Sequence, residues 1–183
     1  MHHQMIRPAG AERETLWVLV AAVVIVAVAV AVVGLNRPVA VVAVPLAHEI
    51  DARADLTAAE QGLHADLLAA AGEIMAMVGT EDAAPSPAVL AADLLPPFIA
   101  DASAEARGGH VWSLHRHGAT LAYAGVSAKP AVAGSLVLIL HGGHAEVWLT
   151  RAAEAPPLPP DPPALIAAGW RRVMSTFSAG VTR

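Results

Sequence analysis

The 183-residue chain has no cysteine, so it can form neither disulfide bonds nor thiolate metal sites. Zinc fingers and cysteine-ligated iron–sulfur clusters are excluded, and any bound metal must take imidazole and carboxylate ligands. The chain also lacks a His-Glu-x-x-His helix, a Gly-x-Ser-x-Gly nucleophile turn and a Gly-x-x-x-x-Gly-Lys phosphate loop. The sequence therefore gives no support to zinc-protease, serine-hydrolase or phosphate-loop chemistry.

Positive charge is sparse: 11 Lys and Arg residues against 16 Asp and Glu give a formal net charge of -5. Nucleic-acid binding needs a clustered basic face, and these basic residues are scattered along the chain. DNA and RNA are therefore excluded as partners. Aromatic residues make up only 4% of the chain, so each of them marks a position of interest.

An uncharged and almost wholly apolar run extends from Leu16 to Leu35. As a helix at about 1.5 Å per residue it would reach about 30 Å, the thickness of the hydrocarbon core of a bilayer. The run is too long for a cleaved signal peptide, and no small-residue cleavage site follows it. We expect a permanent anchor over residues 16–35, with residues 1–15 as a cytoplasmic tail and the following domain on the outer side of the membrane.

Residues 36–154 are expected to form one α+β domain. Pro38 to Pro45 is a strand or an extended connector, because its prolines oppose a continued helix. Apolar residues at helical spacing predict a long amphipathic helix from Leu46 to about Val78, with a break near Gly62. Ser86 and Pro87 then cap and start a short helix.

Two β-hairpins are expected after residue 110, where alternation replaces helical spacing. The first turns at Gly118-Ala119. The second runs from Ser135 to Thr150 and turns at Gly142-Gly143, since Gly-Gly tolerates the positive φ angles of tight hairpin turns. In that register one face carries Leu136, Leu138, Leu140, Ala145, Val147 and Leu149, and the other carries Val137, Ile139, His141, His144, Glu146 and Trp148.

Residues 155–163 form a stiff proline-rich linker, and a C-terminal amphipathic helix is expected over residues 164–183. Its apolar residues include Leu165, Trp170 and Val173. We expect the helix to pack on the domain, and the alternative is that it lies on the membrane surface. The fold class is thus α+β: a transmembrane helix, a long amphipathic helix, an antiparallel sheet of two hairpins and a C-terminal helix.

Histidine is concentrated beyond the anchor, where seven of the nine histidines lie. Residues that flank a two-residue hairpin turn face each other, so His141 and His144 would project side by side, with Glu146 one pair further along. Two imidazoles and a carboxylate suit Zn²⁺, and also Fe²⁺ or Mn²⁺. The alternative is that both are solvated turn histidines.

Three further histidines extend this candidate metal site. His115 and His117 are two residues apart on a strand and so share a face, which lets them chelate an ion or join the second hairpin. His110 follows Gly108-Gly109 and is a further candidate ligand, or it simply ends a loop. Exposed strands also tolerate histidine that binds nothing.

The chain contains a series of short motifs: His48-Glu49, Ala54-Asp55-Leu56, Leu95-Pro-Pro-Phe-Ile-Ala-Asp101, Arg107-Gly-Gly-His110-Val-Trp112, Ala122-Tyr-Ala-Gly125, Gly134-Ser-Leu-Val-Leu138 and Val147-Trp148. With these motifs the chain resembles an uncharacterised bacterial family of small single-pass membrane proteins, often encoded beside metal or metallophore uptake systems. The resemblance covers most of residues 46–150 and implies an accessory role in metal acquisition at the inner membrane, with the domain in the periplasm. It assigns no catalytic residue.

The function expected from the sequence is therefore a membrane-anchored periplasmic accessory protein, not an enzyme, that binds or passes on zinc for a metal importer. The alternative is a structural subunit of an inner-membrane transporter or reductase complex, in which the histidines are incidental. A metal-dependent hydrolase at His141, His144 and Glu146 is the least favoured reading.

Overall fold

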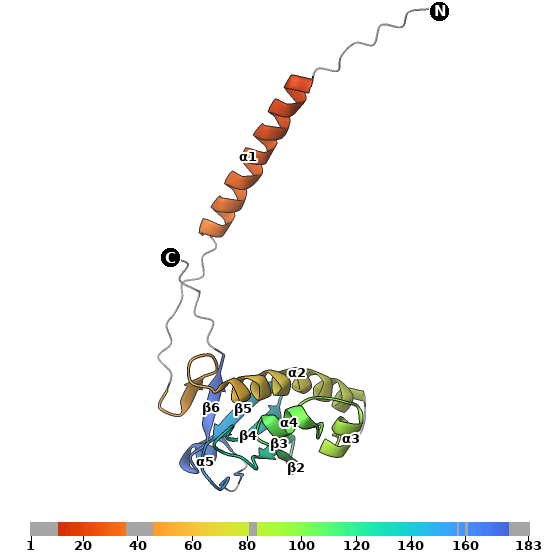
Figure 1. The fold of residues 1–183 in the computed structure, drawn as a ribbon, viewed down its shortest axis with the longest axis vertical. Coiled ribbons are helices and arrows are strands. Elements are labelled where there is room, and N and C mark those ends of the chain that lie inside the picture. Colours follow the sequence, from red (N-terminus) through yellow and green to blue (C-terminus); the bar gives the residue numbers. More distant parts are fainter. Residues whose placement is uncertain (1–10, 36–45, 81–83, 157, 160, 176–183) are drawn as a thin grey trace, which may run out of the picture. The chain divides into compact units, whose positions relative to one another are not determined.

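An apolar helix and a separate α+β unit make up the computed structural model of the chain (Figure 1). The structure describes residues 11–35, 46–80, 84–156, 158–159 and 161–175. The segment from Pro38 to Pro45, expected as a strand or connector, lies outside the described residues. The two units are described separately below.

Helix α1 spans Ala11–Leu35 and leaves its large apolar side chains exposed all round. Thr15–Leu35 is long and apolar enough, by length and composition, to cross a membrane. Exposure of valine, leucine and isoleucine to water on every side of a helix is unfavourable. This composition therefore favours a lipid environment. The expected anchor over residues 16–35 agrees with this helix.

Helix α2 spans Ala58–Thr80, so the prediction of a helix from Leu46 is wrong at its start. The short strand β1 (Glu49–Asp51) and a series of turns precede it instead. Asp51 accepts hydrogen bonds from the backbone N–H groups of Arg53 and Ala54. These bonds close a turn, so the chain does not begin a helix here. Gly62 does not break the helix, and its end at Thr80 lies close to the predicted end at about Val78.

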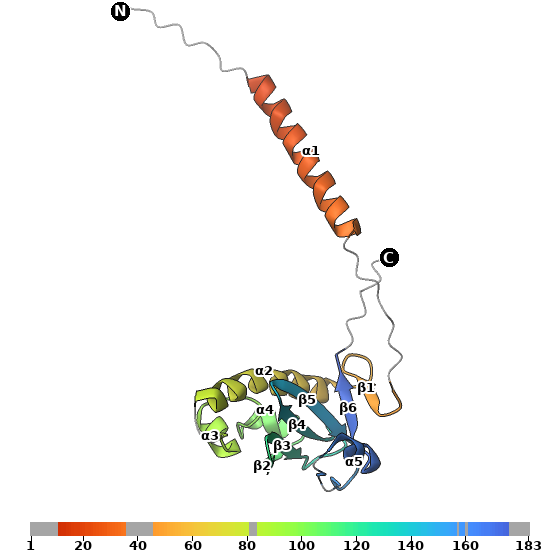
Figure 2. The same cartoon turned by 180° about the vertical axis from the view of Figure 1, so that it is seen from behind.

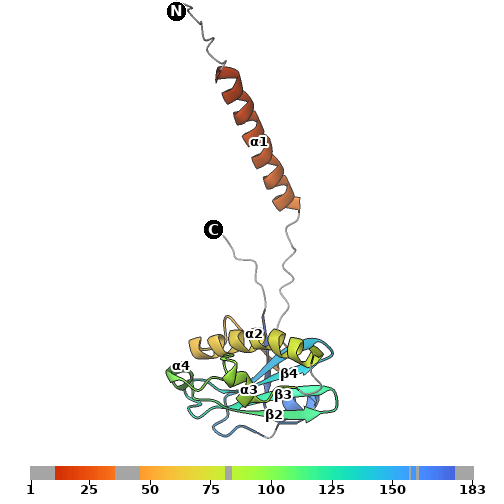
Figure 3. The same ribbon diagram turned by 90° about the vertical axis from the view of Figure 1, so that its right-hand side faces the viewer.

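The N-terminus of α2 is a capping box. The Thr57 hydroxyl accepts the Glu60 N–H, and the Glu60 carboxylate accepts the Thr57 N–H. Two short helices follow on the same side of the sheet: α3 (Pro87–Ala92), capped by Ser86 as predicted, and α4 (Ala102–Ala106), capped by Asp101. Figure 3 shows α2 and α3 over one side of the strands.

The strands form one six-stranded sheet in the order β1-β6-β5-β4-β3-β2. Strands β2 (Val111–His117) and β3 (Thr120–Val126) make the first hairpin, and β4 (Ser135–His141) and β5 (His144–Thr150) make the second. Both turns are at the predicted glycines. The pairs Leu136–Leu149, Leu138–Val147 and Leu140–Ala145 confirm the predicted register and the apolar face of the second hairpin.

The C-terminal segment differs from the predicted helix over residues 164–183. A helix does form, α5 at Pro162–Ala167, but Gly169 has a φ of 89° and the chain continues as strand β6 (Arg171–Met174). Strand β6 lies between β5 and β1 and pairs in parallel with β1, as Figure 2 shows. The segment therefore completes the sheet, and the predicted helical residues beyond Ser175 lie outside the described part.

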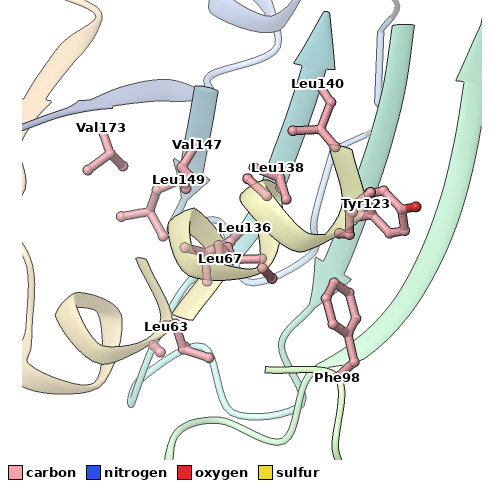
Figure 4. Close-up of a cluster of buried hydrophobic side chains, with 14 of the residues drawn as sticks. Leu63, Leu67, Phe98, Tyr123, Leu136, Leu138, Leu140, Val147, Leu149 and Val173 are labelled. Carbon is pink, nitrogen blue, oxygen red and sulfur yellow. The ribbon is translucent and has the colours of Figure 1, made fainter. Parts of the chain in front are cut away.

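Each face of the sheet has its own apolar cluster. The larger one joins α2, through Leu63, Leu67 and Ile74, to the predicted apolar face of the second hairpin (Figure 4). The smaller one lies on the opposite face, where Leu165 and Trp170 pack against Val137 and Trp148. The C-terminal segment covers only part of that second face, and four of the candidate histidines lie on the remainder: His115, His117, His141 and His144.

Candidate functional site

Four side chains form a row across the tips of the two hairpins, on the face of the sheet opposite α2. The pairs His117–Thr120 and His141–His144 are the last pairs of each hairpin, and the β3–β4 register places Thr120 beside His141. We call His117, Thr120, His141 and His144 the histidine row. The sheet thus brings together three histidines that lie up to 27 positions apart in the sequence.

His141 and His144 lie directly opposite each other across the Gly142-Gly143 turn. Gly142 and Gly143 have φ angles of 57° and 79°, the positive values that a type I′ turn needs at both positions. Both imidazoles are exposed. The Oγ1 of Thr120 lies 3.0 Å from Nδ1 of His141, which orients that ring and leaves its Nε2 available.

The two imidazoles open onto a pocket of about 360 Å³. Thr120, Ile139, Glu146 and Pro162 complete its lining. Strand side chains form its floor, and Pro162, the first residue of α5, brings the C-terminal segment to its edge. The pocket is large enough for an ion with its water ligands or for a small side chain from another molecule.

Glu146, the predicted third ligand, already has two hydrogen-bond partners. Its carboxylate accepts a hydrogen bond from Nε1 of Trp148 at 3.2 Å and one from Arg172 at 3.1 Å. Arg172 also pairs with Glu49, so Glu146 belongs to an ion-pair network at the β1–β6–β5 side of the sheet. Coordination of a metal by Glu146 would compete with these partners.

His115 and His117 lie on the outermost strand, β2, where both are exposed. His117 is in the histidine row, and His115 is one pair further along the same face. The Oγ of Ser113 lies 3.0 Å from Nε2 of His115. One strand, β3, lies between these two histidines and His141, so strands about 4.8 Å apart place the two groups about 10 Å from each other.

His110 lies outside the histidine row and has a structural role. Its Nε2 lies 2.9 Å from the carbonyl oxygen of Gly134, and its Nδ1 is buried without a hydrogen-bond partner. Burial lowers the pKa of His110, so its ring stays neutral at pH 7. The ring also stacks on Trp112. His110 is therefore separate from the other five candidates and holds the loop before β2 against the start of β4.

Within the described part of the chain, no three His, Asp or Glu side chains are close enough together to hold a metal ion. The structure brings His141 and His144 together as a pair, keeps Glu146 and His117 nearby and holds His110 elsewhere. Metal binding at these residues stays a prediction. The available geometry is an open two-imidazole site whose remaining ligands come from water or from another molecule.

Sequence reasoning missed the buried carboxylate of Glu60, which joins three distant segments. Arg151, at the end of β5, donates to both of its oxygens at 2.9 and 2.6 Å, and the Gly134 N–H donates at 3.1 Å. The capping-box spacing of Thr57 and Glu60 was a usable signal for the helix start. Nothing in the sequence indicates Arg151, because 91 positions separate it from Glu60.

Comparison with known proteins gives one match. The model of a protein family described only as a family of unknown function matches residues 50–178, which include the described helices and strands from α2 to β6 and all but the first residue of β1. No curated protein and no solved structure matches the chain.

Proposed function

The chain belongs to that family of unknown function, DUF6162, and from this premise we propose that it is a membrane-anchored domain that binds a transition-metal ion at His141 and His144 and passes it on. The observation that carries the proposal is the pair of exposed imidazoles held opposite each other by the Gly142-Gly143 turn. Two nitrogen donors on a rigid hairpin are pre-organised for one ion.

The pair is suited to transient binding. Structural zinc sites use four protein ligands, whereas this pair leaves positions open for water or for the donor of a partner. An ion held by two imidazoles can leave as a partner's ligands replace its waters. The pocket beside the pair gives such a donor room to enter.

Zinc is the first candidate metal. Imidazole suits Zn²⁺, and a cysteine-free donor set also admits Fe²⁺ and Mn²⁺. The Thr120 hydroxyl beside Nδ1 of His141 supports binding through Nε2, because a partner on one ring nitrogen fixes the role of the other.

The setting we propose is a bacterial inner membrane, with the N-terminus in the cytoplasm and the α+β domain in the periplasm, beside a metal importer or reductase. Helix α1 supports membrane attachment by its length and composition. The sequence resemblance to proteins encoded beside metal uptake systems supports the partner. We propose no catalytic role. A metal-dependent hydrolase would be supported only by turnover that follows metal occupancy.

Calorimetric titration of the full-length chain in detergent micelles with Zn²⁺, and then Mn²⁺, tests the proposal. His2, His3, His115 and His117 are first replaced by alanine, because they offer competing imidazole pairs outside the Gly142-Gly143 hairpin. We expect one ion per chain with a dissociation constant of about 1 µM or below, equivalent to about -8 kcal/mol. The His141→Ala/His144→Ala variant should bind at least tenfold more weakly at this site.

The matched control is His64→Ala in the same background, because His64 is buried between α2 and the sheet and belongs to no candidate pair. Its titration should show the same one-per-chain site as the parent chain. Zinc binding that survives the double substitution, or no binding in the parent, would contradict the proposal. Circular dichroism should show the same fold for the double variant, since the side chains of His141 and His144 are exposed.

The alternative is a structural subunit of a transporter or reductase complex. The exposed apolar side chains of Leu94 and Val111 favour it, because each is 72% exposed in the α+β unit. Under this alternative the His141→Ala/His144→Ala variant keeps full function in cells. Trp170 belongs to the core, as it is buried against the second face of the sheet, so its replacement would test folding and not docking.

A further inference from the structure

Strand β2 is an open sheet edge of seven residues. It pairs with β3 along its whole length, and no other described strand pairs with it (Figure 3). Because His117 and Thr120 flank a two-residue turn, the N–H and C=O groups of residues 111, 113, 115 and 117 point to β3. The corresponding groups of Trp112, Leu114 and Arg116 therefore point away from the sheet.

The usual protections of an exposed edge are missing from β2. It contains no proline and no lysine, and its register with β3 continues without a bulge from Val111 to His117. The one charged side chain, Arg116, bends back and donates to the carbonyl oxygen of Ala84 at 3.0 Å. Such an edge is a template for another strand.

We propose that the β2 strands of two copies of this chain pair antiparallel about His115, and that the imidazoles so opposed bind one transition-metal ion between the copies. In this register the backbone groups of Leu114 bond those of Arg116 of the second copy. His115 then faces His115 of the second copy in a non-hydrogen-bonded pair, the class in which opposed side chains lie closest.

This register is favoured over its neighbours because it opposes imidazoles without opposing like charges. A register centred on Arg116 would oppose His115 to His117 of the second copy, but it would also oppose two guanidinium groups, which destabilises a strand pair. A register centred on Leu114 would oppose Ser113 and His115. The His115 register opposes two imidazoles without opposing the guanidinium groups, and it leaves His117 of each copy two residues along the same face as a third donor at diagonal reach.

A second copy is the occupant that the site itself requires. One chain lacks three donors in one place among its described residues, and its own repetition about a two-fold axis supplies them. The paired edges are a narrow strip, smaller than the roughly 800 Å² per partner of stable interfaces. Each chain also carries a net charge of -5, so the copies repel each other. The dimer therefore depends on the metal.

This site shares no residue with the His141–His144 pair, so either proposal can fail alone. The first experiment compares the full-length chain in detergent micelles with Zn²⁺ and with a chelator. Light scattering and native mass spectrometry of the same samples both measure the mass of the protein. We expect a monomer with chelator and a dimer with zinc. In the His141→Ala/His144→Ala variant the dimer should persist and hold one zinc ion between the copies. His115→Ala should weaken the zinc-dependent dimer at least tenfold.

A matched pair of variants separates strand pairing from loss of a side chain. Arg116→Pro removes an outward N–H, a change that an edge strand tolerates, and should abolish the dimer. Arg116→Ala removes the same side chain and should leave the dimer intact. A dimer that persists with chelator or in Arg116→Pro, or no dimer at saturating zinc, would overturn the proposal and direct attention to the anchor or to a different partner.

The register has a covalent test because the chain has no cysteine of its own. Opposed residues of a non-hydrogen-bonded pair have Cα atoms about 4.5 Å apart, within disulfide range. Oxidation traps even brief encounters of two copies, so His115→Cys should form a disulfide-linked dimer in lipid vesicles although it lacks the histidine that binds zinc. His117→Cys should not, because its two copies lie four residues out of register, about 13 Å apart. Equal crosslinking of both variants would exclude the His115 register.

Discussion

Replacement of Glu60 by glutamine is the sharpest test of the fold. The carboxylate is 1% exposed and accepts hydrogen bonds from Arg151, from the Gly134 N–H and from the Thr57 N–H. It thereby ties the start of α2 to the start of β4 and the end of β5. Burial alone would raise the pKa of Glu60, but hydrogen bonds from Arg151, Thr57 and Gly134 together lower it to about 2.

The pKa gives the size and the sign of the effect. A fall from 4.5 in the unfolded chain to about 2 in the fold is worth about 3 kcal/mol of stability. Because the folded pKa is the lower one, this stability is fully present above pH 4.5. It is lost as the pH falls from about 4.5 to about 2, where Glu60 becomes protonated in the fold as well.

Urea unfolding of the full-length chain in detergent, followed by tryptophan fluorescence, measures both quantities. The Glu60→Gln variant should lose about 2–4 kcal/mol at pH 7, since a buried ion pair is then broken on one side. The loss should shrink steadily below pH 4.5. Glu73→Gln, an exposed change on the same helix, is the control and should alter stability by less than about 0.5 kcal/mol. An unchanged stability at pH 7, or a loss that is constant down to pH 2, would refute the reasoning.

Three further predictions concern packing and acid sensitivity, each measured by the same unfolding assay. Gly134→Ala should destabilise the domain by more than 2 kcal/mol, because its Cβ would lie 2.3 Å from the Thr150 carbonyl oxygen, whereas Gly72→Ala on exposed α2 should stabilise by about 0.5–1 kcal/mol. Leu67→Ala should cost about 2–5 kcal/mol, since the side chain is fully buried. Burial lowers the pKa of His64, so its stabilising contribution exists above pH 6.5 and falls as the pH drops below that value; His64→Leu should flatten this part of the curve.

The two hairpins could be predicted because their signals are local. Period-two alternation fixes which residues share a face, and the Gly142-Gly143 pair fixes the turn and therefore the register. Together these two signals place His141 opposite His144 and put the leucines of β4 on the helix side. No tertiary information was needed for that part of the site.

Strands β1 and β6 could not be predicted because their partners are distant. Ile50 pairs with Val173, 123 positions away, and each strand is too short to show alternation. Leu165, Trp170 and Val173 also fall near one side of a helix, so the apolar spacing favoured a helix where the chain turns at Gly169. The long-range pairing overrides the local pattern.

The same wrong helix affects the prediction of the site. Because residues 164–183 are expected to form a helix, the contact between Arg172 and Glu146 cannot be predicted from the sequence. Glu146 remained on the predicted face, but a strand neighbour holds its carboxylate. His110 is predicted from the sequence as a candidate ligand or as the end of a loop, because its contact with the carbonyl oxygen of Gly134 cannot be foreseen from local spacing.

The division of the sheet explains why the proposed sites can be tested without unfolding the domain. The core that drives folding lies between α2 and one face, and a second cluster under Trp170 and Leu165 covers part of the other. His115, His117, His141 and His144 lie on the uncovered remainder and bury little surface. Their removal therefore costs little hydrophobic stabilisation, since that energy scales with buried apolar area. A loss of zinc binding or of dimerisation in these variants then reports on metal ligation itself.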